Sequence, residues 1–325
     1  NTFPTDTAQY TKRGIASDIP MWIENDCVQC NVCSLQCPHG AIRPFAIDPQ
    51  TDPDYPDNFA TIKCNGTKDL EYRIQISPLD CTGCAVCIET CPADALEMEP
   101  MLSVRDQEQA NWEYCLGLTD RSSRLKPETL RGSQFKPNLL EFSGACPGCG
   151  QTAYAKLVTQ LFGSRMMIAG ATGCSSVWGG SPMINPYSTG EDGCGPAYAR
   201  SLFEDAAEYG YGMKVASDQK RMLLEHRVNA ALTSCADFLG KNLRKQLEIW
   251  SVNTDDSELC QELFPKIKES LAVCMAEVEA SGNPENIKVI KELEEVVDMI
   301  PNICQWIIGG DGWAYDIGFG GLDHL

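Results

Sequence analysis

The sequence predicts two domains, a cysteine-rich α+β domain followed by an α/β domain. Three observations lead to this prediction: a cysteine pattern that repeats within residues 1–120, a polar linker after it, and glycine-rich loops that follow apolar strands in residues 138–325. The length of 325 residues agrees with two domains, because a single domain usually contains about 100–200 residues.

The first domain contains an internal repeat. The spacing C-x2-C-x2-C-x3-C-P begins at Cys27 and again at Cys81, and an aspartate precedes each run. A strand-like segment over 72–76 leads into the second run. The repeat predicts two pseudo-symmetric halves. The eight cysteines of the two runs are Cys27, Cys30, Cys33, Cys37, Cys81, Cys84, Cys87 and Cys91.

The spacing of these runs is that of bacterial ferredoxins with two 4Fe-4S clusters, in which three thiolates of a run bind one cluster and the fourth binds the other. Zinc knuckles and disulfides are the alternatives, and eight cysteines in register disfavour both. Such clusters transfer single electrons, so an electron donor and an acceptor are needed. We expect one cluster on Cys27, Cys30, Cys33 and Cys91, and the other on Cys81, Cys84, Cys87 and Cys37.

The composition disfavours several classes of partner. Acidic residues outnumber basic ones by 45 to 26, which gives a net charge of −19. This charge opposes binding to nucleic-acid phosphates and to anionic membranes, and no apolar stretch approaches the length of a membrane span. The 18 cysteines are clustered in a long chain, which favours metal binding in a reducing, cytoplasmic compartment over a secreted disulfide scaffold.

A polar, locally basic linker over 121–137 separates the two domains. Helical and apolar strand patterns alternate after it, which is typical of an α/β domain. We expect helices over 152–162, 196–208 and 219–232, and strands over 165–169 and 305–308.

A charged helical hairpin is expected over about 255–302. Its turn offers Asn283 as an N-cap and Pro284 at the first helical position. Pro265 should kink the first helix or end it early, because proline has no N–H to donate and its ring clashes with the preceding turn.

A second group of cysteines lies in the α/β domain. Cys146 and Cys149 form a C-x2-C pair with proline and glycine around it, and Cys174 follows a glycine. The spacing by itself fits a cluster, zinc, a redox pair or buried thiols. A fourth ligand is not evident.

A glycine-rich turn, Gly309-Gly310-Asp311-Gly312, follows the expected strand over 305–308. Free N–H groups at such a turn can bind a diphosphate, and the Asp311 carboxylate can bind an Mg²⁺ ion that bridges to it. The turn is not the dinucleotide fingerprint G-x-G-x-x-G, because Tyr315 stands where the third glycine is needed. The alternative is a plain glycine turn with a solvated aspartate.

These three features, in this order, resemble the pyruvate:ferredoxin (or flavodoxin) oxidoreductases, and the resemblance covers essentially the whole chain apart from the hairpin over 255–300. Further segments match the family: 12–16 (KRGIA), 131–135 (RGSQF), 142–146 (FSGAC), 171–176 (ATGCSS), 201–205 (SLFED) and 310–324 (GDGWAYDIGFGGLDH).

The resemblance implies an α+β ferredoxin-like domain with two 4Fe-4S clusters, followed by an α/β thiamine-diphosphate-binding domain that is truncated. Cys146, Cys149 and Cys174 match three ligands of a third 4Fe-4S cluster beside that cofactor, and Asp311 matches the Mg²⁺ ligand. Gln151 stands where many members have Glu. The implied cofactor-binding residues are Gln151, Cys174, Gly310, Asp311, Gly312 and Trp313.

The implied enzyme converts pyruvate and coenzyme A to acetyl-CoA and CO₂, and passes single electrons to ferredoxin or flavodoxin. It is an anaerobic, cytoplasmic homo-oligomer that binds neither nucleic acid nor membranes.

In the family, the substrate-clamping domains precede this segment, and both the thiamine motif and the fourth ligand of the third cluster extend past the position of Leu325. We therefore expect the chain to be a fragment of a longer polypeptide, or one subunit of a split enzyme. No catalytic residue is assigned within it. The alternatives are a stand-alone iron–sulfur electron-transfer module, or the same enzyme class acting on another 2-oxoacid.

Overall fold

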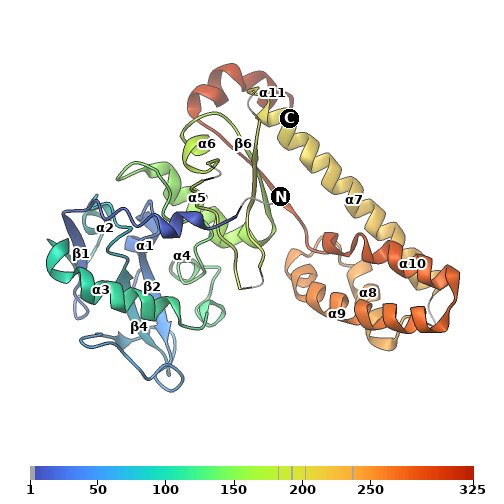
Figure 1. Cartoon of the computed structure of the whole chain (residues 1–325), viewed down its shortest axis with the longest axis horizontal. Helices are drawn as coiled ribbons and strands as arrows, with labels where there is room; N and C mark the ends of the chain where they lie inside the picture. The colour runs from blue at the N-terminus through green and yellow to red at the C-terminus, as the bar shows by residue number, and fades with distance from the viewer. Residues whose placement is uncertain (1–3, 182, 192, 202, 236–237) are drawn as a thin grey trace.

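The computed structural model describes residues 4–181, 183–191, 193–201, 203–235 and 238–325. Figure 1 shows a cysteine-rich N-terminal part, a small parallel sheet beside it, and a helical lobe at the far end. Residues 1–3 of the first predicted domain lie outside the described residues. So does Leu202, which falls in both the helix predicted over 196–208 and the matched segment 201–205.

The N-terminal part consists of two interleaved halves. The first half contains β1 (Asp18–Trp22), α1 (Val32–Gln36) and β2 (Ile42–Ile47), and the second contains β4 (Glu71–Ile76), α2 (Val86–Glu89) and β5 (Leu96–Pro100). β1 pairs antiparallel with β5, and β2 pairs antiparallel with β4. Each half therefore gives one strand to each sheet. The predicted strand over 72–76 is confirmed as part of β4.

Two further elements complete this part. The short β3 (Ile62–Lys63) pairs with β4 on the edge away from β2, and α3 (Met101–Leu116) packs on β4. Tyr72 of β4 and Trp112 of α3 are both buried, in separate clusters: Tyr72 packs beside the cysteine runs, and Trp112 packs against Phe142. The remaining short elements of the chain are η1 (Thr7–Tyr10), η2 (Ser122–Arg124), α4 (Leu130–Ser133), η3 (Gly163–Arg165), η4 (Val297–Met299), the π-helical turn η5 (Trp313–Ile317) and α11 (Phe319–His324).

The α/β part is built on a three-stranded parallel sheet with the strand order β7-β6-β8. The predicted helix over 152–162 and the two predicted strands over 165–169 and 305–308 are confirmed with small shifts at their ends. The elements are α5 (Gly150–Phe162), β6 (Met166–Gly170), α6 (Cys174–Trp178), β7 (Ala197–Arg200) and β8 (Cys304–Ile308).

The helix predicted over 196–208 is wrong in its first half. Residues 197–200 form β7, which pairs in parallel with β6, and α7 (Ala206–Ser234) begins only after Asp205. Pairing with the buried strand β6 gives residues 197–200 a ladder of hydrogen bonds, and this outweighs their local preference for a helix. The predicted helix over 219–232 is confirmed as a piece of α7.

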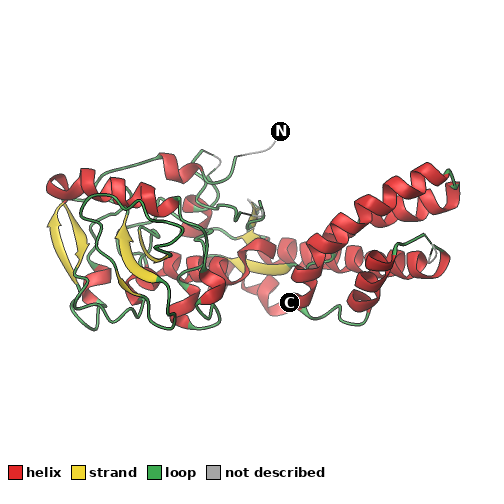
Figure 2. Ribbon diagram, turned by 90° about the horizontal axis from the view of Figure 1, so that it is seen from below, coloured by secondary structure: helices red, strands yellow, loops and turns green. Residues whose placement is uncertain are grey.

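A lobe of four helices lies between β7 and β8 in the sequence. It consists of α7, α8 (Lys241–Ser251), α9 (Ser257–Ser281) and α10 (Pro284–Glu294). α7 starts against β6 and β8 and runs into the end of the molecule that carries no strand, where Figure 2 shows the other helices of the lobe. The lobe has a hydrophobic core of its own, in which Leu247, Trp250 and Ile267 are fully buried.

The turn between α9 and α10 forms as the sequence predicts. The Asn283 side chain accepts hydrogen bonds from the N–H groups of Glu285 and Asn286, at 3.1 and 3.4 Å, and Pro284 opens the helix. The helix does not end early at Pro265, since α9 continues through it to Ser281, and a kink at this position stays a prediction. Leu263 and Ile267 are buried on either side of the proline, and their packing holds the helix together across the missing hydrogen bond.

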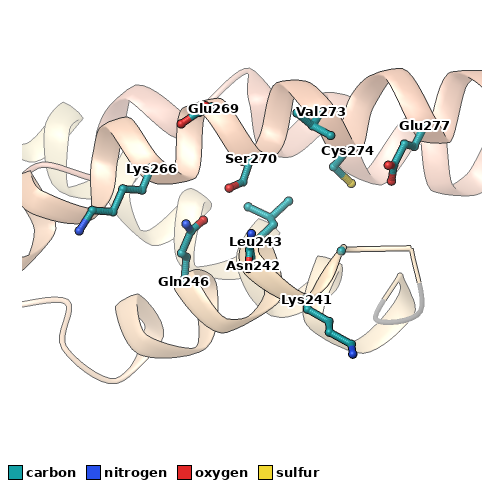
Figure 3. A pocket seen from close by; sticks show the side chains of 11 residues that line it. Lys241, Asn242, Leu243, Gln246, Lys266, Glu269, Ser270, Val273, Cys274 and Glu277 are labelled. Carbon is teal, nitrogen blue, oxygen red and sulfur yellow. The ribbon is translucent and has the colours of Figure 1, made fainter.

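A groove of about 440 Å³ separates α8 from α9. Figure 3 shows the α9 side chains Lys266 and Glu269 on one side of it and Gln246 of α8 on the other. The one thiol on its wall, Cys274, donates a hydrogen bond to the carbonyl oxygen of Phe238 at 3.4 Å. No predicted site residue lines this groove. In the described part of the chain, no helix is both long enough and apolar enough to cross a bilayer.

The separate core of the helical lobe leads to a stability prediction. Leu247→Ala should lower the free energy of unfolding by about 2–5 kcal/mol, because Leu247 is fully buried and its loss leaves a cavity. Val273→Ala, at a side chain that is 58% exposed, should change it by less than about 0.5 kcal/mol. Urea unfolding followed by circular dichroism measures both, and equal midpoints for the two variants would contradict the packing described here.

Candidate functional site

The fourth cysteine of the first run lies with the second run. Cys37 lines one cavity together with Cys81, Cys84 and Cys87. This convergence follows from the pairing of β2 with β4, because Cys37 lies just before β2 and the second run lies just after β4. These four thiols are the predicted ligands of one cluster.

The complementary exchange occurs at the first run. The pKa of the Cys33 thiol is raised to about 12, mainly by burial and then by negative charge on Cys27 and Cys30. Charge on Cys91, the fourth cysteine of the second run, raises this pKa as well. Cys91 therefore lies within electrostatic range of the first run, as the predicted ligand set for the other cluster requires.

The loops that carry the two runs have the same backbone shape. Gln29 and Asn31 in the first run and Gly83 and Ala85 in the second, at equivalent positions, all have left-handed φ angles between 58° and 66°. The N–H of Gln29 points at Cys27 Sγ and that of Gly83 at Cys81 Sγ, both at 3.4 Å. Such N–H···S contacts stabilise negative charge on sulfur, which is how proteins tune iron–sulfur clusters.

The thiols of both runs are costly to ionise without a metal. Burial raises the pKa of Cys81 to about 12, with Cys37 and Cys84 adding to the increase. The pKa of Cys87 is also raised, by burial and then by charge on Cys37. Thiolates are the form of cysteine that binds metal. A cationic core would offset the repulsion between the neighbouring thiolates. The donor set and its apolar surroundings therefore fit an iron–sulfur group.

A single metal ion would need its ligands closer together than these thiols lie. Among the residues that the structure describes, no three His, Cys, Asp or Glu side chains lie close enough to hold one metal ion. In a cluster each thiolate binds a different iron, so its ligands lie farther apart than those of one ion.

The second group of cysteines lies beside the second run. Cys149 caps the N-terminus of α5, and its N–H donates to the Cys146 carbonyl oxygen at 3.1 Å. The loop between them contacts α2, since a Cβ placed on Gly148 would lie 3.8 Å from the Val86 side chain. Cys146 is exposed, as is Cys174 at the start of α6.

All six predicted cofactor-binding residues line one hollow of about 440 Å³. They come from three places in the sequence: the start of α5, the loop after β6 and the loop after β8. Since β6 is the central strand and β7 and β8 flank it, the hollow lies at the carboxyl ends of two parallel strands, where α/β sheets usually bind ligands. The six residues are Gln151, Cys174, Gly310, Asp311, Gly312 and Trp313.

The floor of this hollow consists of bare backbone. Gly173 has φ +147°, and a Cβ placed there would lie 2.8 Å from the Gly310 nitrogen. The Gly310 N–H in turn donates to the Thr172 carbonyl oxygen at 3.2 Å. The two glycine loops therefore meet without side chains between them, which lets a ligand approach the main chain closely.

The sequence analysis missed Glu204 as a residue that supports this hollow. Its carboxylate accepts a hydrogen bond from the Thr172 hydroxyl at 2.7 Å, and its carbonyl oxygen accepts one from Trp313 Nε1 at 3.1 Å. Glu204 has a left-handed φ of 61°. It thereby joins both loops, and the only signal in the sequence was its place in the matched segment 201–205.

The comparisons with known proteins agree with this geometry. Residues 26–94, which contain both cysteine runs, match the family described as a 4Fe-4S double cluster binding domain. The chain is 46% identical to pyruvate-flavodoxin oxidoreductase of Enterobacter agglomerans, over 100% of this chain and 27% of that protein. The chain is also 46% identical to pyruvate:ferredoxin oxidoreductase of Moorella thermoacetica, over 99% of this chain and 27% of that protein.

The predicted resemblance to a segment of the pyruvate:ferredoxin (flavodoxin) oxidoreductases is confirmed. A third relative, pyruvate dehydrogenase (NADP(+)), mitochondrial, of Euglena gracilis, is also 46% identical over the whole chain but only 17% of its own length is covered. The chain thus spans about a quarter or less of these relatives. In this chain, the hollow and the second group of cysteines lie outside the matched cluster-binding domain.

The close approach of the two glycine loops predicts a strong effect of one methyl group. Gly173→Ala should lower the free energy of unfolding by about 1–3 kcal/mol, since the methyl group meets the Gly310 backbone and the φ angle is unfavourable for alanine. Gly320→Ala, in α11 with open space around it, should change it by less than about 0.5 kcal/mol. Thermal unfolding distinguishes them; an unchanged melting temperature for Gly173→Ala would contradict the described contact.

Proposed function

We propose that this chain is the electron-transfer and cofactor-binding segment of a pyruvate:ferredoxin or flavodoxin oxidoreductase. The intact enzyme would carry out the thiamine-diphosphate-dependent oxidative decarboxylation of pyruvate, with coenzyme A, to acetyl-CoA and CO₂. Electrons would leave singly for ferredoxin or flavodoxin. Two observations together carry the proposal. One hollow gathers Gln151, Cys174 and Asp311, and in the same chain Cys37 of the first cysteine run lies with the second run.

We assign the domains as the sequence predicts them. Residues 1–120 would be the ferredoxin-like domain with two 4Fe-4S clusters, 121–137 the linker, and 138–325 the thiamine-diphosphate domain with the helical hairpin over about 255–302. The parallel sheet and the ligand-sized hollow at its carboxyl edge support the second assignment.

The cluster ligands follow from the convergence of the thiols. When bound, a 4Fe-4S cluster supplies one-electron transfer at a potential set by its surroundings. The chain provides apolar walls that exclude water, and N–H groups aimed at sulfur. Cys27, Cys30, Cys33 and Cys91 would hold one cluster, and Cys81, Cys84, Cys87 and Cys37 the second. From the resemblance, Cys146, Cys149 and Cys174 would hold three corners of a third.

The lining residues of the hollow offer donor chemistry that thiamine diphosphate and Mg²⁺ would need. Asp311 offers the hard oxygen that Mg²⁺ prefers, and the bare backbone of Gly310 and Gly312 leaves room for the diphosphate. When bound, thiamine supplies an electron sink for the decarboxylation. Trp313 is held in place by its hydrogen bond to Glu204, and Gln151, which lines the hollow from the start of α5, would face the cofactor.

The loop with Cys146 and Cys149 lies against α2, which supports a short path for single electrons from the hollow to the ferredoxin-like domain. A stand-alone electron-transfer module would need no such hollow. The printed names of the relatives favour pyruvate over other 2-oxoacids. Clusters of this kind need a reducing compartment, so we place the enzyme in the cytoplasm. From the resemblance, we also propose that the enzyme is a homo-oligomer.

Serine variants of single cysteines test whether the fourth cysteine of each run binds the cluster of the other run. In the full-length enzyme, Cys37→Ser should damage the cluster that Cys84→Ser damages, and Cys91→Ser the one that Cys30→Ser damages, because each fourth cysteine lies with the opposite run. Iron and sulfide analysis with EPR spectra of the four variants identifies the affected cluster.

The matched control for these variants is Cys274→Ser, in the helical lobe, which should retain the wild-type iron content. Spectra in which Cys37→Ser resembles Cys30→Ser would contradict the exchange of ligands between the runs.

Asp311→Ala should weaken Mg²⁺-dependent binding of thiamine diphosphate by at least about 100-fold, since even residues that only support metal ligands typically contribute 10–100-fold to affinity. Asp316→Ala is the matched control, because Asp316 is exposed nearby but does not line the hollow. Calorimetric titration of the full-length enzyme measures both affinities. Tight binding retained by Asp311→Ala would refute the role of this carboxylate.

A further inference from the structure

Lys156, in the middle of α5, is the least expected charged residue of the chain. Its side chain is completely buried. The other buried acidic and guanidinium groups in the described part of the chain each belong to an ion pair: Arg73 with Glu108, Asp80 with Lys12, and Glu141 with Arg43. Among the same residues, Lys156 forms no ion pair with a carboxylate.

The Lys156 ammonium group instead lies at the cysteine runs. Its Nζ donates hydrogen bonds to the carbonyl oxygens of Ser34 and Cys37, the latter at 3.0 Å. Burial lowers the pKa of Lys156 to about 8, while negative charge on Cys37 raises it, the guanidinium of Arg43 lowers it, and negative charge on Cys33 raises it less strongly. Arg43 already forms an ion pair with Glu141, so the thiolates are the anions left to face Lys156.

A buried charge without a partner of opposite sign is strongly unfavourable, and proteins retain one only where something else neutralises it. A 4Fe-4S cluster with four thiolates is negatively charged, and it becomes one charge more negative on reduction. A fixed cation beside it therefore stabilises the reduced form more than the oxidised form, which raises the reduction potential.

We propose that Lys156 raises the reduction potential of the cluster held by Cys37, Cys81, Cys84 and Cys87. This inference rests on the proposed function. It makes α5 a link between two sites, because Gln151 at the start of the same helix lines the cofactor hollow. An electron that leaves the hollow would thus reach a cluster that Lys156 of α5 makes easier to reduce.

The test is an EPR-monitored redox titration of the full-length enzyme, purified without oxygen. Lys156→Gln keeps a hydrogen-bond donor but removes the charge. At a fixed solution potential its reduced-to-oxidised ratio at this cluster should fall about tenfold, which is a midpoint lower by about 59 mV for a one-electron couple. The cluster on Cys27, Cys30, Cys33 and Cys91 should shift less.

Two control variants separate charge from packing and from net charge. Lys156→Arg keeps the positive charge and should retain a midpoint near that of the wild type. Lys214→Gln removes the charge of an exposed lysine on α7 that is paired with Asp218, and should change neither midpoint. A downward shift in Lys156→Arg equal to that in Lys156→Gln would overturn the electrostatic explanation.

If Lys156→Gln does not load with iron, Lys156→Met addresses the same question. It fills similar space without a charge and should lower the same midpoint. Unchanged midpoints in whichever of these two variants is loaded overturn the inference. A wild-type enzyme that contains no iron and sulfide would instead contradict the proposed function, so the two failures are distinguishable.

Discussion

The exchange of strands between the two halves of the N-terminal part is the constraint on which the rest depends. Because β1 pairs with β5 and β2 with β4, neither half can form its sheet alone. The same pairing carries Cys37 to the second run and Cys91 to the first. Burial and mutual charge raise the pKa of thiols in both groups, so ionising them together is costly unless a cationic core binds them.

Buried polar contacts then fix the α/β part against these sites. Lys156 reaches the carbonyl oxygens of Ser34 and Cys37, and the Gln134 side chain joins Ser34 to Gln160 on α5. Such contacts are directional and costly to leave unmade. They hold the start of α5, with Cys149 and Gln151, in one position relative to the cysteine runs, as electron transfer between the two parts would require.

The helical lobe shows how a long excursion of the chain leaves the sheet intact. Residues between β7 and β8 include α7, α8, α9 and α10, yet β8 returns to pair with β6 in parallel. The lobe buries its apolar side chains in a core of its own, and it packs on β6 and β8 through the start of α7. Gly310 consequently meets Gly173, although these residues are far apart in the sequence.

The sequence by itself determined the features that depend on local spacing or local backbone chemistry. The two cysteine runs, the Gly310-Asp311-Gly312 turn and the cap at Asn283 fall in this class, because ligand wrapping and capping need particular residues a few positions apart. Only the tertiary structure decided the rest. Residues 197–200 became a strand through pairing with β6, α9 survived Pro265 through packing at Leu263 and Ile267, and Glu204 and Lys156 acquired their roles from partners distant in sequence. Those outcomes depend on which surfaces meet after folding, and spacing along the chain does not encode that.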